Sequence, residues 1–123
     1  MSGFDLLVDT NILVYLTGGN RNASEAVRGK RLSISFITEM ELRSWPSLTS
    51  PELQVIEKLI HQCRIIDLAD EIKERAIQIR RESKLKLPDA IVAATAFYLD
   101  LPLLSADRQF TKVKGLDLFL ITK

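Results

Sequence analysis

The residues of this sequence best suited to chemistry are four acids, Asp9, Glu41, Asp89 and Asp107. Asp9 directly follows the apolar run 6–8, which predicts a buried strand that ends at this carboxylate. A helix is expected to begin beside it, near Thr10. In open α/β sheets, ligands bind outside the carboxyl ends of the strands. Asp9 is therefore predicted to lie on the functional edge of such a sheet.

Each of the four acids also has a structural explanation. Asp9 and Asp107 stand where helix N-caps are expected, and Asp is a favoured N-cap residue. The segment Thr38–Glu41 matches a capping box. Asp89 would lie in the first turn of a helix, where the helix dipole favours a negative charge. Sequence alone leaves open by which path Asp89 would reach the edge that carries Asp9.

Taken together, the four acids indicate a metal site. Several ionised carboxylates at one edge would repel each other unless a cation compensated them. Oxygen ligands select Mg²⁺ or Mn²⁺ rather than zinc, and the scarcity of His and Cys agrees with this. Such sites activate water for phosphodiester hydrolysis, often with two metals. Polar neighbours that are candidates for orienting water or phosphate are Thr10, Asn11 and Ser105.

The apolar periodicity predicts strands that alternate with helices. Strands are expected at 5–8, 32–35, 64–67, 101–105 and 116–121. Helices are expected at 11–17, 23–29, 37–43, 51–62, 69–83 and 88–99, and a short one at 107–110. The 51–62 helix is expected to carry Leu53, Ile56, Leu59 and Ile60 on a single face. Without hairpin signals, this alternation predicts a mostly parallel sheet covered by helices on both faces.

Composition indicates one domain that spans residues 1–123. Hydrophobic residues make up 46% and charged residues 27%, which is the balance of a soluble globular protein. No apolar run approaches the roughly 18 residues of a membrane span, and no leader-like segment opens the sequence. We therefore expect a cytoplasmic protein with no membrane partner, and the single cysteine agrees with a reducing compartment.

The net charge of +1 is uninformative, but the basic residues are clustered. The clusters are Arg28, Lys30 and Arg31; Arg80, Arg81, Lys84 and Lys86; and Arg108, Lys112 and Lys114. A polyanionic partner would bind patches of this kind. They are equally compatible with solvated helix faces, and the second cluster also suits the C-terminal end of a helix.

Four segments of the sequence, in this order, resemble those of a PIN-domain ribonuclease, specifically a VapC-type toxin. They are residues 8–13, 35–42, 87–96 and 104–110. The resemblance implies a three-layer α/β/α fold with a five-stranded parallel sheet. It also implies Mg²⁺- or Mn²⁺-dependent endonucleolytic cleavage of RNA, a homodimer, and inhibition by a VapB-like antitoxin.

On this sequence, the resemblance assigns the metal-binding and catalytic roles to Asp9, Glu41, Asp89 and Asp107. Glu39 departs from the small or apolar residue usual in the family, and Glu41 is preferred because Leu42 completes the family's Glu-Leu pair. Arg43 and Arg108 are predicted to contact phosphate near the metal, although Arg43 could instead bind the antitoxin or face water. Residues predicted to guide the RNA backbone inward are Arg80, Arg81, Lys84 and Lys86.

Three other functions remain as alternatives. A structure-specific DNA nuclease would use the same acids, but its larger members need elements for which this chain has no room. Phosphoryl transfer by Asp9 as an aspartyl nucleophile would require a second Asp two residues later, but that residue is Asn11, which disfavours this alternative. The third alternative is a non-catalytic binding module that associates with a small partner and regulates DNA occupancy. The helix at 88–99 and the face of 51–62 are candidate dimer surfaces.

Overall fold

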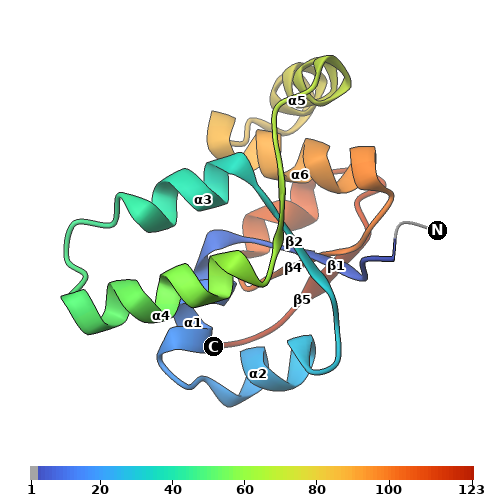
Figure 1. Ribbon diagram of the computed structural model, residues 1–123. Helices are drawn as coiled ribbons and strands as arrows, with labels where there is room; N and C mark the ends of the chain where they lie inside the picture. Colours follow the sequence, from blue (N-terminus) through green and yellow to red (C-terminus); the bar gives the residue numbers. More distant parts are fainter. Residues whose placement is uncertain (1–2) are drawn as a thin grey trace.

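The computed structural model describes residues 3–123, in which five strands form one parallel sheet (Figure 1). The strands are β1 (Leu6–Val8), β2 (Leu32–Ser35), β3 (Arg64–Ile66), β4 (Leu103–Ser105) and β5 (Leu118–Leu120). Their order across the sheet is β3-β2-β1-β4-β5, and every pairing is parallel. The predicted parallel sheet is therefore confirmed.

The helices also lie close to their predicted positions. They are α1 (Thr10–Thr17), α2 (Arg21–Val27), α3 (Phe36–Arg43), α4 (Ser50–His61), α5 (Asp70–Ser83) and α6 (Leu87–Leu99). The short helix after β4 is a 3₁₀ helix, η1 (Arg108–Lys112). Among the helices of residues 3–123, none combines the length and the apolar character that a membrane crossing requires.

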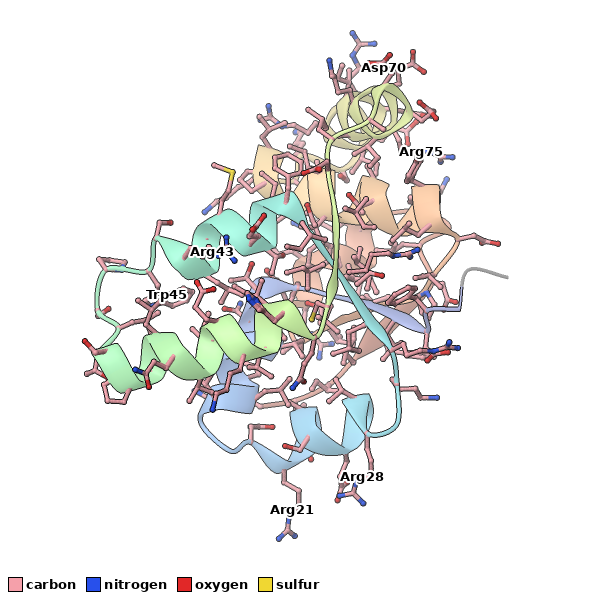
Figure 2. All side chains as sticks on the ribbon, in the orientation of Figure 1. Arg21, Arg28, Arg43, Trp45, Asp70 and Arg75 are labelled. Atoms are coloured by element: carbon pink, nitrogen blue, oxygen red, sulfur yellow. The ribbon has the colours of Figure 1, made fainter. Side chains whose placement is uncertain are left out.

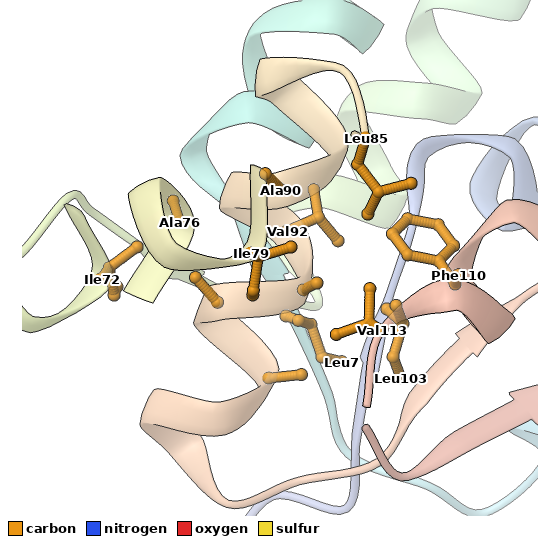
Figure 3. Packing of buried hydrophobic residues seen from close by; sticks show 13 residues of the cluster. Leu7, Ile72, Ala76, Ile79, Leu85, Ala90, Val92, Leu103, Phe110 and Val113 are labelled. Atoms are coloured by element: carbon orange, nitrogen blue, oxygen red, sulfur yellow. The ribbon is translucent and has the colours of Figure 1, made fainter. Parts of the chain in front are cut away.

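Two hydrophobic clusters, one on each face of the sheet, hold the helices in place. Side chains alternate between the faces of a strand, so Leu7 of β1 faces one cluster while Leu6 and Val8 face the other. The Leu7 cluster takes residues from α5, α6 and η1 (Figure 3), and the opposite cluster takes residues from α1, α2, α3 and α4. The three-layer α/β/α arrangement is thus confirmed.

The direction in which successive strands are added to the sheet reverses at β1. The chain runs from β1 outward through β2 to β3, and then returns through α5 and α6 to β4 on the other side of β1. A reversal of this kind leaves a crevice at the carboxyl ends of the two central strands, where α/β proteins bind ligands. Asp9 follows β1 at this crevice, and Ser105 is the last residue of β4.

The apolar face predicted for α4 is buried only in part. Ile56 and Ile60 are 1% exposed, whereas Leu53 is 39% exposed. Residues 50–55 are exposed throughout, so only the second half of the helix is buried against the rest of the chain. At the end of α4, the Cys63 thiol donates to the carbonyl of Leu59 at 3.3 Å. Burial raises the pKa of this thiol to about 11.

Candidate active site

The four predicted acids line one cleft of ≈ 180 Å³ at the reversal point of the sheet. The full lining consists of Asp9, Thr10, Asn11, Glu41, Trp45, Asp89, Val92 and Asp107. Asp89 reaches the cleft because α6 begins there, with Asp89 in its first turn. This resolves the path that the sequence left open. None of the lining residues is basic.

Asp9 is the buried acid of the cleft, with 6% of its surface exposed. It is the N-cap of α1, as predicted, and its Oδ1 accepts from the backbone N–H of Ile12 at 3.2 Å. Its Oδ2 accepts from the hydroxyl of Ser105 at the end of the neighbouring strand. The carboxylate is therefore fixed by two elements that the parallel pairing of β1 and β4 brings together.

The acids of the cleft carry uncompensated negative charge. Burial raises the pKa of Asp9 from 3.8 to about 6; hydrogen bonds from Ser105 and Ile12 oppose this shift, and the charges of Asp107 and Asp89 add to it. Burial also raises the pKa of Asp89, and the charges of Asp107 and Glu41 act in the same direction. Lys86 opposes the shift of Asp89 more weakly than these causes. These acids are thus close enough to disfavour each other's ionisation.

Ser105 connects Asp9 to Asp107. Its Oγ, whose proton is directed at Asp9, accepts from the backbone N–H of Asp107 at 2.9 Å. Asp107 is the N-cap of η1, as predicted, and its Oδ1 accepts from the N–H of Gln109 at 2.9 Å. One hydroxyl thereby contacts two of the four acidic residues, the carboxylate of Asp9 and the backbone of Asp107.

Glu41 does not form the capping box that the sequence suggested. Ser35, the last residue of β2, is the N-cap of α3 and accepts from the N–H of Ile37 at 3.1 Å. The helix therefore begins earlier than predicted, and Thr38 already lies inside its first turn. The Oε1 of Glu41 instead accepts from the hydroxyl of Thr10 at 2.6 Å. The structural explanation offered for Glu41 is wrong.

A second threonine supports this contact. The Oγ1 of Thr38 is 3.3 Å from that of Thr10, and Thr38 is completely buried. The single proton of the Thr10 hydroxyl is directed at Glu41, so the proton between the two threonines comes from Thr38. Thr38, Thr10 and Glu41 form a chain of hydroxyl donors that ends on an acid of the cleft.

The donors of the cleft fit a hard divalent cation in chemistry. The four acids and Asn11 supply oxygen, and the cleft contains no His or Cys. In the part of the chain that the structure describes, however, no three His, Cys, Asp or Glu side chains are arranged so that they could hold a metal as they stand. The acids share a cleft without forming a closed coordination shell.

Of the predicted phosphate contacts, Thr10 and Asn11 line the cleft. Arg43 does not, because its guanidinium is paired with Glu39 at 2.9 Å and with Glu57 of α4 at 3.2 Å (Figure 2). Glu39, which competed with Glu41 for a site role, is thus directed away from the cleft lining. Arg108 follows Asp107 directly but is exposed and outside the lining.

The four residues predicted to guide RNA are exposed and lie at the junction of α5 and α6, outside the cleft lining. The Nε of Arg80 donates to the carbonyl of Leu85 at 3.2 Å, which gives this side chain a structural role. Lys84 ends α5 in a left-handed conformation, and Lys86 is the N-cap of α6. A role in RNA binding stays a prediction for Arg80, Arg81, Lys84 and Lys86.

Sequence reasoning missed Trp45, Val92 and Thr38. Trp45 is 36% exposed and forms part of the cleft wall beyond the end of α3 (Figure 2). Val92 lies three residues after Asp89 on α6, and residues three or four apart share a helix face. That spacing could have indicated Val92 from Asp89. Trp45 lies beyond the end of α3, so helical spacing from Glu41 does not indicate it. Nothing in the sequence pattern indicated the contact of Thr38 with Thr10.

Comparisons with known proteins agree with this geometry. The family model described as PIN domain matches residues 6–116. A chain of a toxin–antitoxin complex from Klebsiella pneumoniae aligns with a TM-score of 0.81 and 32% identity, covering 95% of this chain and 100% of that one. None of the curated protein sequences compared with this chain matches it.

Two further structures share the fold at lower identity. VapBC2 from Rickettsia felis, bound to a DNA fragment from its promoter, aligns with a TM-score of 0.79 and 19% identity over 94% of this chain and 98% of that one. VapBC-1 from nontypeable Haemophilus influenzae aligns with a TM-score of 0.78 and 22% identity over 94% and 96%.

Proposed function

The chain belongs to the PIN-domain family, and we propose that it is a metal-dependent endoribonuclease that serves as the toxin of a toxin–antitoxin pair. The observation that supports this most is the cleft itself. Asp9 is buried among three further acids, with no basic residue in the lining. Without a cation such a group of carboxylates is electrostatically unfavourable.

In this proposal Asp9, Glu41, Asp89 and Asp107 hold Mg²⁺ or Mn²⁺. A bound divalent ion would lower the pKa of an attacking water and polarise the phosphodiester. The protein supplies the positions of the ligands. Ser105 fixes Asp9 and Asp107, and Thr10 fixes Glu41. Asn11, exposed at the cleft, is assigned to orienting the phosphate.

The toxin role is supported by the relative from Klebsiella pneumoniae, whose structure is a toxin–antitoxin complex and which aligns over its whole length. We therefore propose a VapB-like antitoxin as the protein partner and a homodimer as the assembled form. Exposed apolar side chains available for these contacts are Leu53 and Val55 on α4 and Leu87 and Tyr98 at the ends of α6. The rest of α6 is largely buried within the chain.

The test is a cleavage assay with the purified chain on matched single-stranded RNA and DNA. With Mg²⁺ or Mn²⁺ we expect cleavage of RNA and none of DNA, and chelation with EDTA should abolish it. Asp9→Asn should abolish cleavage while circular dichroism shows a folded protein. Asp117→Asn is the matched control, because Asp117 is exposed and outside the cleft lining.

Two results would contradict the proposed ribonuclease activity and favour one of the alternative functions. Cleavage of DNA in preference to RNA would favour the DNA-nuclease alternative. If wild type and Asp9→Asn were equally inactive towards both nucleic acids across metals, the chain would be a non-catalytic binding module.

A further inference from the structure

A second hollow, of ≈ 300 Å³, lies outside the acid cleft, between α5, Phe97 of α6 and the segment that follows η1. Three cationic side chains line it, those of Arg75, Lys112 and Lys114. Its single acid is Glu82. None of the functional residues assigned above belongs to this hollow.

The backbone places the two lysines side by side. Val113, between them, is 7% exposed and packs in the cluster shared by α5, α6 and η1 (Figure 3). Its backbone is extended, with φ −88° and ψ 110°. Neighbours of an extended residue point to the side opposite to it, so burying Val113 directs Lys112 and Lys114 outward together. Both lysines are exposed.

Arg75 is held against the same hollow. Its guanidinium lies 4.5 Å from the centroid of the Phe97 ring, within the range of a cation–π contact. Gly115, next to Lys114, approaches the same ring, since a Cβ there would be 3.9 Å from Phe97, and its φ of +79° suits glycine. The cationic side chains of the hollow are therefore held in place, Arg75 by its contact with Phe97 and the two lysines by the burial of Val113 between them.

The positive charge of the hollow is not neutralised within residues 3–123. Neither Arg75 nor either lysine forms an ion pair there. The Oε1 of Glu82 accepts from the Nε2 of Gln78 at 3.3 Å, so the one acid is engaged by an amide. Three cations against one acid leave an excess of positive charge that a bound anion would compensate.

We propose that this hollow is a phosphate-binding subsite for the backbone of the RNA substrate, a proposal that rests on the function proposed above. Asp107 of the acid cleft is the N-cap of η1, and Lys112 is its last residue. At about 2.0 Å of rise per residue, a 3₁₀ helix of this length separates the backbone of Asp107 from that of Lys112 by about 10 Å. A strand cleaved at the acids can reach the hollow within a few nucleotides.

An RNA backbone fits the hollow better than an acidic protein segment. Six of the nine lining residues are charged or polar; of the three apolar ones, Ile79 and Val113 are buried in the core, and the Phe97 ring faces the Arg75 guanidinium. A protein segment would need exposed apolar anchors, whereas phosphate contacts come from clustered Lys and Arg.

The test uses the double variant Lys112→Ala/Lys114→Ala, in which both truncated side chains are exposed and Val113 is retained. Affinity for a fluorescent single-stranded RNA oligonucleotide of mixed sequence is measured in the Asp9→Asn background with Mg²⁺, so that binding is separated from cleavage. We expect affinity to fall about tenfold. The slope of log K against log salt should decrease by about 1.4, since each contacted phosphate of a single strand contributes about 0.7.

The matched control is Arg21→Ala/Arg28→Ala, which removes the exposed cations at the first residue and the C-cap of α2, at the opposite end of the molecule from Arg75 (Figure 2). The control should leave both the RNA affinity and the slope of log K against log salt unchanged. An equal loss in the control, or no loss in the lysine variant, overturns the subsite. So does a lysine variant that keeps RNA affinity but loses binding to poly-glutamate, which would assign the hollow to an acidic protein.

Failure of the subsite and failure of the proposed function are separate results. A wild-type chain that cleaves RNA while the lysine variant binds it normally contradicts only the subsite. A chain that never cleaves RNA, but binds it through Lys112 and Lys114, contradicts only the nuclease assignment.

Discussion

The carboxyl group of Asp9 links the charge of the cleft to the stability of the chain. Its pKa rises from 3.8 to about 6 on folding, so between these pH values the native state holds a proton that the unfolded chain has released. The free energy of unfolding therefore falls as pH rises through this window and stays lower above it. In metal-free buffer at neutral pH, Asp9→Asn should raise the free energy of unfolding by about 1–3 kcal/mol.

Urea unfolding of both proteins at a series of pH values measures this difference. The gain of Asp9→Asn should shrink as pH falls towards 4, where the wild-type carboxyl group is neutral as well. A variant that is less stable than wild type at neutral pH would show that the hydrogen bonds to Ser105 and Ile12 outweigh the cost of burying the charge.

Thr38 offers a sharper residue-level prediction. Thr38→Val keeps the shape of this buried side chain but removes the proton donated to Thr10. Loss of one neutral hydrogen bond is worth about 1 kcal/mol, so RNA cleavage should fall about fivefold. The Mg²⁺ concentration at half-maximal rate should rise, because Glu41 is held less firmly.

Thr38→Ser is the control for that change, since it restores the hydroxyl. It should recover both the rate and the Mg²⁺ dependence. Equal rates in the Val and Ser variants would assign Thr38 a packing role only.

Among the elements, α5 depends on tertiary packing for its position. Ile79 is 4% exposed and packs with residues of α6 and η1, whereas Ile77 of the same helix is 53% exposed. Ile79→Ala should lower the free energy of unfolding by about 2–4 kcal/mol through the cavity it leaves. Ile77→Ala, the same substitution on the outer face, should change it by less than about 0.5 kcal/mol. Urea unfolding of the two variants tests whether α5 docks as described.

The sequence predicts the positions of helices and strands better than it predicts their capping residues or how far each helix is covered. Apolar periodicity is enough to locate the strands and helices, because each buries one face. The start of α3 was misjudged because two capping patterns compete, and Ser35, at the end of β2, is used in place of Thr38. Leu53 shares the helical spacing of Ile56, yet it is exposed because no other element within residues 3–123 covers the first half of α4. Periodicity carries no information on where a neighbouring layer stops.

The same holds for the site. The strand-end position of Asp9 and the N-cap position of Asp107 follow from local pattern. Asp89 lies in the cleft because the two helices between β3 and β4 are arranged so that α6 begins there. Local sequence patterns do not determine that arrangement. Trp45 joins the cleft through the end of α3, where no motif indicates it.

At the scale of the whole molecule, metal binding should stabilise the fold. The cleft lies where β1 and β4 meet, so a cation held there ties together segments from the two ends of the chain. At 100 times its Kd, Mg²⁺ would raise the free energy of unfolding by about 2.7 kcal/mol. The Tm of wild type should therefore rise with Mg²⁺, and that of Asp9→Asn should not.

NaCl at equal ionic strength is the control for that experiment, because it screens the acids without binding among them. A Tm increase that is the same in Asp9→Asn, or that NaCl reproduces, would contradict a metal site in the cleft.

The environment of Cys63 has a practical consequence. It is the one cysteine of the sequence, and its thiol stays protonated at neutral pH because its pKa is about 11. Maleimide dyes react with thiolates, so the native side chain is nearly inert towards them. A cysteine introduced in place of Lys114 can thus be labelled selectively, which lets fluorescence follow an approaching nucleic acid without first removing the native thiol.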